Sequence, residues 1–569
     1  MNEQEGIYIY DNDANLVYSS WGSGGPGVIH APQVCNYKGS PHLCFYQGVQ
    51  MIGWGHGHGV IMDSHYRVVK SIEPSGSYQA SSDMHEFRLI DGDRALMTQY
   101  LRSVHDLCDY DLCDGLGYIQ QGAFQEIDVE TGEVIFEWHS LDHIALDESY
   151  VLPSSTEISG SGQEPTSPWD YFHINSIDKN DDGDYLISAR HVSAVYKISG
   201  QDGHIIWRLN GAKSDFHLDN FGFSFQHDAR WISDSKDESV ISVFNNGGNG
   251  FNQTHPHSDG KIIHIDHKTK VARVLQKINP PFIDGHAHYA KSQGNFQTLP
   301  DGGIVMGWGY DPFFTEYAPG ETEDREIVFY GYLALGHMMN YRTHKFDGWI
   351  GRPLTKPALW TYSKTGEEDS GMIMYFSWNG ATEVSRWALY GAAAKNGPYV
   401  LLATRDKNGF ETIYRHRKML PWTYAEALDK NGESLGKSAP QETYVPRQEL
   451  RQYCDDLACQ FMPSQEQRDR EREQATEQKA SQRGGFLAQK KDQILFGSGI
   501  GASILLAIIA VVLGTRNRVK SAILRSVDRV WRLIWGKLGE EATGPEYRAV
   551  AGDEGDDEEV KAPMFRGDG

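Results

Sequence analysis

Short apolar runs separated by polar turns dominate the first 420 residues of the chain. In each copy of this pattern, two apolar runs flank a turn rich in Asp, Asn and Gly, which is typical of a β-hairpin. The 3.6-residue period of an amphipathic helix is missing over this region, so the pattern predicts an all-β domain. The six copies span residues 7–18, 59–69, 124–138, 194–207, 261–274 and 399–413, and the last copy is the most divergent.

The spacing of the hairpins indicates how they are arranged. They follow one another at intervals of about 50 to 70 residues, with one longer gap, and each interval leaves room for two more strands. Four-stranded units repeated around an axis form the blades of a β-propeller. A large two-sheet sandwich is the alternative, but it explains the long regular period less well. We therefore expect a β-propeller over residues 1–425 and an extension with a cysteine pair over residues 426–463.

The hydrophobic pattern changes near the C-terminus, where residues 494–513 contain no charged side chain. A run of this length can cross about 30 Å of hydrocarbon as a helix. A buried core helix is the alternative, but the flanking charges and the absence of an amphipathic pattern disfavour it. The pattern predicts a transmembrane helix over residues 494–514. Around it we expect a charged helical stalk over 464–493, a basic amphipathic juxtamembrane helix over 515–540 and an acidic disordered tail over 541–569.

Six cysteines lie in three close pairs. Cys35 is paired with Cys44, Cys108 with Cys113, and Cys454 with Cys459. Local pairs of this kind predict small-loop disulfides in an oxidising compartment. A metal site would favour Cys-x-x-Cys spacing or a Cys/His cluster, which these intervals fit less well. Asn252 begins an Asn-Gln-Thr sequon and is a predicted glycosylation site, which supports the same compartment.

Charges beside the predicted span bear on its orientation. Basic residues after the span favour a cytoplasmic C-terminus, and basic residues before it weaken the asymmetry. The cysteine pairs and the sequon favour a single-pass membrane protein with a lumenal or extracellular N-terminal domain. Residues 1–5 do not resemble a signal peptide, so we expect the start of the chain to be incomplete. Insertion as a tail anchor, with a cytosolic N-terminal domain, is the alternative.

The formal net charge of −24 argues against a nucleic-acid-binding protein, because such proteins are more often basic. An acidic chain can still bind an anionic small molecule where a few Arg and His residues gather. Residues 169–191 contain such a group. Two antiparallel strands are predicted here, over 171–177 and 185–190, and a turn over 180–183 joins them.

Pairing across this turn would bring four polar side chains together. If Asn180 pairs with Gly183, His173 lies opposite Arg190, and Asn175 opposite Ser188. All four then share one face, which would point into the channel of a propeller. Arginine offers a planar fork to a tetrahedral oxyanion, and neutral histidine can act as a nucleophile or a base. A structural hydrogen-bond network is the alternative, and the interpretation depends on the register.

Further histidines precede short predicted strands, at His85, His227, His286 and His288. A lone histidine at the start of a strand is usually structural, but its repetition in successive units favours a functional role. The Gly-His-Gly-His-Gly run at residues 55–59 could bind a metal, but no third ligand is evident, so we interpret it as a loop. We expect no metal site.

These motifs resemble the arylsulfotransferase family, and most closely its eukaryotic, mainly fungal, branch. The resemblance covers about residues 5–420. It rests on Tyr171-Phe-His173-Ile-Asn175-Ser, Ser188-Ala-Arg190-His191, Asp83-Met-His85-Glu-Phe87, Gln226-His227-Asp228-Ala229-Arg230, Ser292-Gln-Gly-Asn295-Phe-Gln297, Gly307-Trp308-Gly309 and Ser377-Trp-Asn-Gly380.

The resemblance implies a six-bladed propeller that moves a sulfuryl group from an aryl sulfate to a phenol, without a nucleotide donor and without a cofactor. It implies that His227 is the nucleophile, transiently sulfated, and that His85, His173 and Arg190 stabilise the transferring group. Asn175 and His288 are the expected substrate contacts. A non-catalytic propeller that binds an anionic or aromatic ligand is the second hypothesis, and a hydrolase or lyase on the same scaffold is the third. The sulfotransferase hypothesis requires four side chains to converge in the channel, those of His85, His173, Arg190 and His227.

Overall fold

The computed structural model of the chain describes residues 6–21, 28–75, 81–156, 158–283, 286–321, 325–333 and 339–453. Within these residues the regular secondary structure is almost entirely β-strand, which confirms the all-β prediction. Its helices there are five short 3-10 turns, at Cys108–Tyr110, Ser140–Asp142, Leu146–Glu148, Glu368–Ser370 and Gln448–Tyr453.

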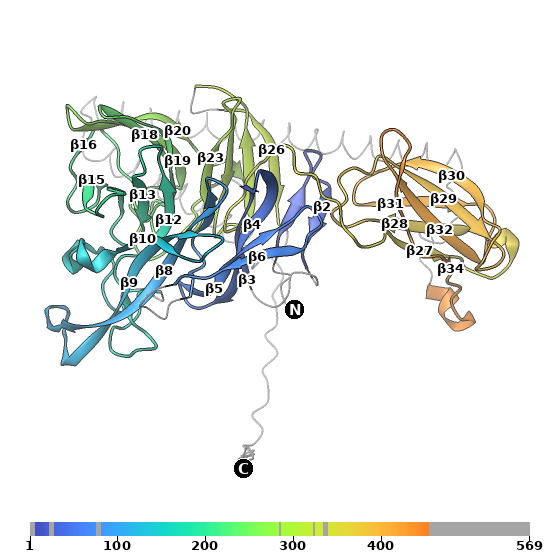
Figure 1. Cartoon of the computed structure of the whole chain (residues 1–569), viewed down its shortest axis with the longest axis horizontal. Helices are drawn as coiled ribbons and strands as arrows, with labels where there is room; N and C mark the ends of the chain where they lie inside the picture. The colour runs from blue at the N-terminus through green and yellow to red at the C-terminus, as the bar shows by residue number, and fades with distance from the viewer. Residues whose placement is uncertain are drawn as a thin grey trace, which may run out of the picture. The chain divides into compact units, whose positions relative to one another are not determined.

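Five four-stranded antiparallel sheets follow one another along the chain (Figure 1). The first contains β3 (Val28–Tyr37), β4 (Ser40–Gln50), β5 (Gly55–Met62) and β6 (Val68–Ile72). The second contains β7 (Phe87–Ile90), β8 (Arg94–Leu107), β9 (Leu112–Asp128) and β10 (Val134–His139). The third contains β12 (Ile174–Lys179), β13 (Tyr185–Ala189), β14 (Ala194–Ile198) and β15 (Ile205–Asn210). The fourth contains β17 (His227–Asp234), β18 (Glu238–Asn245), β19 (Asp259–Asp266) and β20 (Val271–Ile278), and the fifth β23 (Asn295–Thr298), β24 (Ile304–Gly307), β25 (Phe313–Tyr317) and β26 (Ile327–Tyr332).

Short strands accompany these sheets. β11 (Trp169–Asp170) pairs with β9, and β16 (His217–Leu218) pairs with β20. Two further pairs stand alone, namely β1 (Tyr8–Tyr10) with β2 (Leu16–Ser19), and β21 (Phe282–Ile283) with β22 (His286–Ala287).

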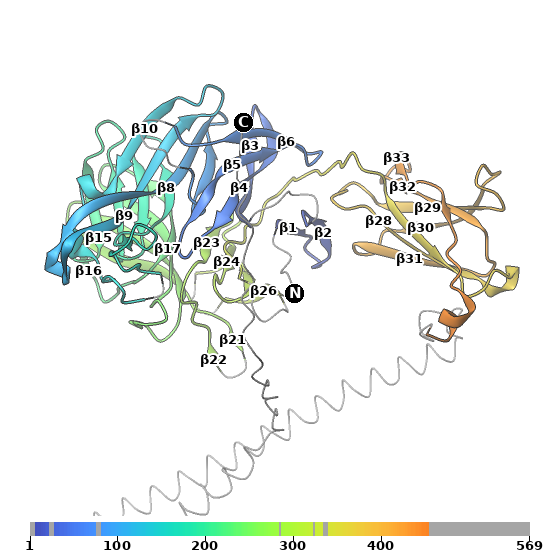
Figure 2. The ribbon, with the colours of Figure 1, turned by 90° about the horizontal axis from the view of Figure 1, so that it is seen from below.

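Each pair of successive sheets encloses its own apolar core. Phe87, Met97 and Ile127 of the second sheet pack on the first, and Phe172, Ile177 and Tyr185 of the third region pack on the second. Two further clusters join the third sheet to the fourth and the fourth to the fifth. A sheet packed on both faces has no polar face, and every residue of β13 and β14 is buried. Figure 2 shows the five sheets following one another as blades do, so the arrangement is propeller-like.

The hairpin predictions can be compared with the observed strand pairs. Five of the six are confirmed, as β1–β2, β5–β6, β9–β10, β14–β15 and β19–β20. In the first four sheets the repeated hairpin forms the third and fourth strands. The sixth prediction, over residues 399–413, is wrong because its two strands pair in different sheets.

Residues 358–442 form a two-sheet sandwich in place of a blade. One sheet contains β27 (Ala358–Tyr362), β28 (Met372–Ser377) and β31 (Glu411–His416). The other contains β30 (Val400–Asp406), β29 (Arg386–Ala392), β32 (Trp422–Leu428), β33 (Ser434–Lys437) and β34 (Gln441–Glu442). Met374, Phe376 and Trp387 belong to the core between the sheets. The predicted domain boundary after residue 425 therefore falls inside β32, because alternation alone does not tell a sandwich strand from a blade strand.

Two of the three predicted disulfides are present, Cys35–Cys44 and Cys108–Cys113. Cys454 and Cys459, which were predicted to form the third disulfide, lie outside the described residues, so that bridge stays a prediction. The predicted stalk, transmembrane helix, juxtamembrane helix and acidic tail lie outside them too.

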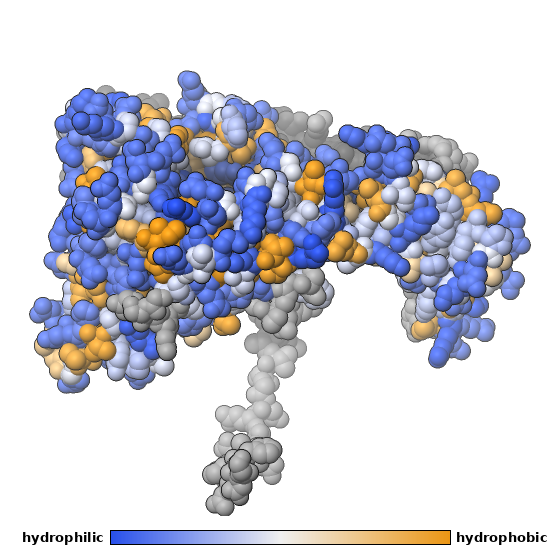
Figure 3. Space-filling model, in the orientation of Figure 1, coloured by the Kyte–Doolittle hydropathy of each residue, from blue (hydrophilic) through white to orange (hydrophobic). Residues whose placement is uncertain are grey.

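Among the described residues no helix has the length and apolar character to span a bilayer. On the face seen in Figure 3, hydrophilic residues cover most of the surface and hydrophobic residues gather in small separate groups.

Candidate active site

A cavity of about 180 Å³ lies where the first strands of the second, third and fourth sheets begin. His85 precedes β7, His173 precedes β12, and His227 is the first residue of β17. Arg190 directly follows β13. All four side chains line the cavity, together with Gln50, Met84, Asn249, Phe251, Lys291, Gln293, Tyr310, Met339 and Tyr341, among others. The structure thus brings together the four residues singled out in the sequence, and the ring centres of His85 and His173 are 4.8 Å apart.

The protonation state of His227 is fixed by Asn246, which follows β18. The Asn246 amide nitrogen donates to the carbonyl oxygens of Ala290 (2.8 Å) and Gln293 (3.0 Å). Its Oδ1 atom therefore faces Nδ1 of His227, at 2.7 Å, and Nδ1 must be the nitrogen that carries the proton. Nε2 accepts a hydrogen bond from the Gln293 backbone N–H at 3.2 Å. His227 is thus a neutral imidazole whose lone pair lies on Nε2.

His85 and His173 are held by carboxylates behind the cavity. Nδ1 of His85 lies 2.5 Å from Oδ1 of Asp83, and Nδ1 of His173 lies 2.5 Å from Oδ2 of Asp170. Each ring therefore donates from Nδ1 and directs Nε2 away from its carboxylate. His173 has a left-handed backbone (φ 56°), which removes it from the alternation of the following strand.

The guanidinium of Arg190 is held in one orientation. One of its terminal nitrogens donates to Nε2 of His191 at 2.8 Å, and the other donates to the backbone oxygen of Lys291 at 3.1 Å. His191 can accept at Nε2 because its Nδ1–H donates to the backbone oxygen of Asp170 at 2.6 Å. Arg190 is 2% exposed, so a fixed positive charge is almost fully desolvated beside the cavity.

Electrostatics make the cavity favourable for an anion. Burial lowers the pKa of His173 and His227 well below the ordinary value, and the charge of Arg190 lowers each further. Burial also raises the pKa of Asp170 to about 6, against the effect of the neighbouring His and Arg side chains. The carboxylates lie behind the histidines and do not line the cavity. A bound anion would therefore meet the arginine and the imidazoles before any acidic group.

The predicted register is correct at only one end of the β12–β13 pair. Ile174 pairs with Ala189, and the Arg190 N–H donates to the His173 oxygen at 2.9 Å, as predicted. A bulge at Asn175 then shifts the register, so that Ser176 lies opposite Ser188.

Two predicted substrate contacts do not line the cavity. The Asn175 amide donates to the Gln226 oxygen (2.8 Å) and accepts from the Asp228 N–H (3.3 Å), so it joins the third sheet to the fourth. His288 lies 3.2 Å from Asp311 and packs on Phe313, outside the cavity wall.

The loop interpretation of residues 55–59 is also wrong, because these residues begin β5. The glycines are needed for packing. A Cβ atom on Gly57 would collide with the Gln47 backbone, and one on Gly59 with the Phe87 ring. His56, between Gly55 and Gly57, is exposed and contacts Ser81, 2.6 Å away.

Several residues of the site were not found from the sequence. Asp83 and Asp170 stand two and three residues before their histidines, and this spacing is a signal that could have indicated them. Asn246, Gln293 and Tyr341 carry no comparable local signal, because only the packing of distant segments brings Gln293 and Tyr341 to the cavity and Asn246 to His227.

One group of side chains has the spacing of a metal site. The ligand atoms of Asp170, His173 and His191 lie within 4.8 Å of one another. Nδ1 of His173 already binds Oδ2 of Asp170, Nδ1 of His191 binds the Asp170 backbone oxygen, and Nε2 of His191 accepts from the Arg190 guanidinium. A cation there would displace these bonds and lie beside a fixed positive charge, so the set fits a metal poorly.

Comparison with known proteins gives one family. The model of the family described as Arylsulfotransferase (ASST) matches residues 33–329. Among curated proteins nothing matches. The similar solved structures include a protein of unknown function from Bacteroides caccae, at 13% identity and TM-score 0.33, covering 59% of this chain and 93% of that one. A protein of unknown function from Dyadobacter fermentans DSM 18053 has 10% identity and TM-score 0.31, and the match covers 66% of this chain and 94% of that one. The periplasmic gluconolactonase PpgL of Pseudomonas aeruginosa has 9% identity and TM-score 0.26, and the match covers 74% of this chain and 97% of that one. At these TM-scores the three similarities support no conclusion about this chain.

Proposed function

The chain belongs to the arylsulfotransferase (ASST) family, and from this premise we propose that it transfers a sulfuryl group from an aryl sulfate ester to a phenolic acceptor through a sulfo-histidine on His227. The observation that supports this most is the convergence of His85, His173, Arg190 and His227 on one cavity. A sulfate ester is a tetrahedral anion, and the cavity offers it a guanidinium and three imidazoles. No nucleotide donor, metal or other cofactor enters the proposed reaction.

The first half of the reaction uses the lone pair on Nε2 of His227. Nε2 attacks the sulfur, an S–N bond forms, and the S–O bond to the aryl group breaks with its electrons leaving on the phenolate oxygen. The binding of an anion favours protonation of His173, since it has a carboxylate on Nδ1. Its Nε2–H group then donates to a sulfuryl oxygen, beside His85, and protonates the leaving phenolate.

The second half reverses these steps with a new phenol. The acceptor oxygen attacks the sulfur, the S–N bond breaks, and the phenol proton returns to the histidine that donated one. Arg190 remains charged throughout. Its position, set by His191 and the Lys291 oxygen, suits the equatorial oxygens of the transferring group.

A non-catalytic binding module is the second candidate function, and two observations favour it. The cavity is small, and the lone pair of His227 already accepts a hydrogen bond from the Gln293 N–H. In this function the same groups would hold an anionic or aromatic ligand without transfer.

The cellular setting is part of the proposal. We propose a six-bladed propeller that is lumenal or extracellular and tethered by residues 494–514, with a cytoplasmic C-terminus and a glycan on Asn252. The two disulfides, Cys35–Cys44 and Cys108–Cys113, support an oxidising compartment. A third disulfide, between Cys454 and Cys459, belongs to the same proposal. A fungal origin is proposed on the sequence resemblance alone.

The proposal predicts that the full chain releases 4-nitrophenolate from 4-nitrophenyl sulfate repeatedly only when a phenol acceptor is present, because without one the reaction stops at the sulfo-histidine after one release per chain. His227→Ala should abolish this release, since it removes the nucleophile. His288→Ala is the matched control, and it should retain the rate because His288 lies outside the cavity. Release should be followed by absorbance, and sulfation of the phenol by mass spectrometry. Absence of transfer from the folded wild type with several phenols would favour the binding module.

A further inference from the structure

The outer face of the three-stranded sheet in the sandwich carries large aromatic side chains. Side chains alternate along a strand, so Met374 and Phe376 of β28 point into the sandwich core and Tyr375 points outward. Trp360 of β27 lies directly opposite Tyr375 in the register of the two strands. Trp360 is 51% exposed, although a tryptophan is usually well buried. This sheet therefore presents a large apolar ring to solvent.

Three tyrosine rings surround Trp360. Tyr362 follows it on the same face of β27, and Tyr444 lies beside Tyr362 through a parallel bridge. The ring centre of Trp360 is 5.7 Å from that of Tyr362, 5.5 Å from that of Tyr375 and 6.2 Å from that of Tyr444. Tyr444 is 47% exposed. Contiguous exposed patches of this kind mark interaction sites, and these four residues are named the aromatic face.

The rings of the aromatic face do not cover one another. Its four closest pairs are tilted by 33–35°, and their centres are at least 5.5 Å apart. On the other sheet of the sandwich, Tyr390 and Tyr424 stack at 4.5 Å with their planes 13° apart, so each covers a face of the other. Stacking within the protein therefore accounts for the second pair, whereas the half-exposed rings of Trp360 and Tyr444 can still receive a ligand.

The next strand, β31, adds polar groups beside the rings. Ile413 lies opposite Tyr375, and Glu411 and Arg415 flank Ile413 on the same face. Nε of Arg415 is buried and has no hydrogen-bond partner among the described residues. A buried donor without a partner is unfavourable, so a ligand oxygen beside it would gain a hydrogen bond. The aromatic face is thus bordered by groups that can donate and accept.

This combination indicates the chemistry of the ligand. A hexose with equatorial substituents has apolar C–H faces and a rim of hydroxyl groups, so it can lie on an aromatic ring and bond to polar groups beside it. A nucleic acid or an anionic membrane would require a cluster of cations. Here the sheet brings one cation, Arg415, and one carboxylate, Glu411, and Arg451 lies near Tyr362. A neutral sugar chain fits this balance of charge.

We propose that the aromatic face binds a single chain of a neutral polysaccharide built of equatorially linked hexoses. Such a chain is extended, so its consecutive sugars can lie over consecutive strands of the sheet. Trp360, at the centre of the group, stacks on one sugar, and Arg415 donates to a hydroxyl oxygen of the chain. The tilt of 33–35° between neighbouring rings follows the twist of the sheet, and it fits one twisted chain better than a flat crystalline surface.

The test titrates the full chain with cellohexaose and, separately, with chitohexaose, in a buffer free of sugar-based detergents. Isothermal titration calorimetry measures the binding. We expect saturable binding of at least one of the two oligosaccharides. Maltohexaose, whose axial linkages coil the chain, should bind more weakly, because its sugars cannot follow an extended row of rings.

Variants connect the binding to the aromatic face. Trp360→Ala should weaken it by about tenfold or more, since truncation of a central tryptophan is costly in most interfaces. Trp360→Phe keeps a ring and should weaken it less. Trp21→Ala is the matched control, because Trp21 is also highly exposed, at 59%, and lies outside the sandwich. Arg415→Met, which removes the donor, should weaken binding too, and thermal unfolding confirms that each variant is folded.

Absence of binding of both oligosaccharides to the folded chain would overturn the proposal. Binding that Trp360→Ala leaves unchanged would overturn it as well, and so would equally tight binding of maltohexaose. Self-association that is lost in Trp360→Ala, without any binding of sugar, would assign the aromatic face to a protein contact instead. Sulfuryl transfer plays no part in the measurement, so failure of sugar binding and failure of the proposed enzyme activity are separately visible.

Discussion

Single residues in the cavity are each fixed by a partner that lies behind it. Asn246 holds His227, Asp83 holds His85, and His191 holds Arg190. The three histidines differ in the group that holds Nδ1, which is a neutral amide for His227 and a carboxylate for His85 and His173. The amide leaves His227 uncharged, as the proposed nucleophile requires, and the carboxylate behind His173 favours the charged form of that ring once an anion is bound.

This division predicts the effect of Asn246→Asp. A carboxylate on Nδ1 would stabilise the imidazolium form and raise the pKa of His227, which burial now keeps well below its ordinary value. Protonated His227 has no lone pair on Nε2, so activity should be lost below the raised pKa, at a higher pH than in the wild type. The pH dependence of kcat/KM measures this shift. Asn220→Asp, on an exposed turn, is the control and should leave the profile unchanged.

At the scale of elements, a glycine on a third strand faces an aromatic ring of the next blade in three places. The pairs are Gly59 with Phe87, Gly122 with Phe172, and Gly260 with Phe296. In each pair, a Cβ atom on the glycine would overlap the ring. The absence of a side chain therefore allows the close approach of two sheets, and it recurs because the blades repeat.

Gly59→Ala and Gly260→Ala are thus predicted to destabilise the fold through overpacking, each by about 1–3 kcal/mol. Urea denaturation followed by tryptophan fluorescence measures the change. Gly366→Ala is the matched control, since a Cβ atom there meets nothing within 4 Å, and its stability should be unchanged or slightly higher. Equal effects of all three substitutions would contradict the packing argument.

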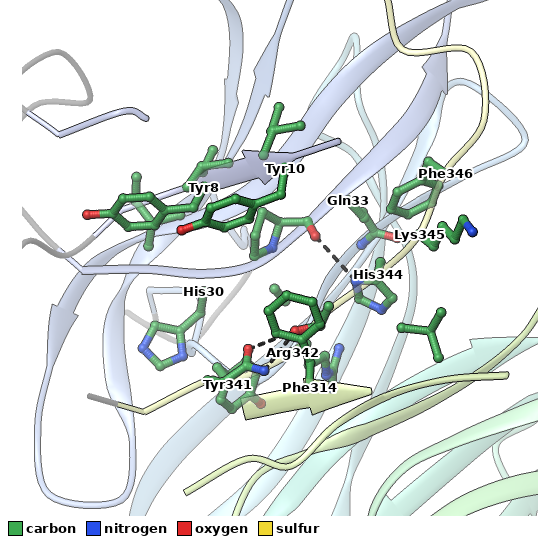
Figure 4. A pocket seen from close by; sticks show the side chains of 18 of the residues that line it. Tyr8, Tyr10, His30, Gln33, Phe314, Tyr341, Arg342, His344, Lys345 and Phe346 are labelled. Carbon is green, nitrogen blue, oxygen red and sulfur yellow. Dashed lines mark hydrogen bonds between the residues drawn. The ribbon is translucent and has the colours of Figure 1, made fainter. Parts of the chain in front are cut away.

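At the scale of the whole molecule, a buried ionic network joins sheets that are distant in the sequence. Arg342 donates to Glu86 Oε1 at 2.9 Å and to the Asn175 oxygen at 2.8 Å. Arg230 binds Glu86 Oε2 at 2.5 Å. Burial alone would raise the pKa of Glu86, but the two arginines outweigh it and lower that pKa. The network therefore ties the segment at residues 340–346, which Figure 4 shows from close by, to the second and third sheets.

Removal of one member of this ionic network should destabilise the fold. Arg342→Met leaves Glu86 buried with one counter-ion fewer, and the free energy of unfolding should fall by about 3–5 kcal/mol at neutral pH. The pKa of Glu86 is lowered in the folded state, so the stability it contributes is present above its ordinary pKa and lost as pH falls through the folded value. In Arg342→Met the folded-state pKa of Glu86 should be less lowered, so this pH-dependent loss should be smaller and should end at a higher pH. Urea denaturation at several pH values tests both statements, and Lys38→Ala, which breaks a solvent-exposed ion pair with Glu130, should change neither.

What the sequence determined by itself is local. The hairpins β5–β6, β9–β10, β14–β15 and β19–β20, and the disulfides Cys35–Cys44 and Cys108–Cys113, depend on residues close together in the chain, and their patterns were sufficient to predict them. The histidines at successive strand starts were visible for the same reason, because blades repeat and the repetition places equivalent residues around one cavity.

Only the tertiary structure decided which strands pair and which groups meet. Residues 399–413 alternate as a hairpin does, yet their two strands join different sheets of a sandwich, since alternation specifies a strand but not its partner. The bulge at Asn175 exists because its amide binds residues 226 and 228 of the next blade, and Asn246 reaches His227 only through the folded fourth sheet. Contacts of this kind join residues that are far apart in the chain, and no short-range pattern encodes them.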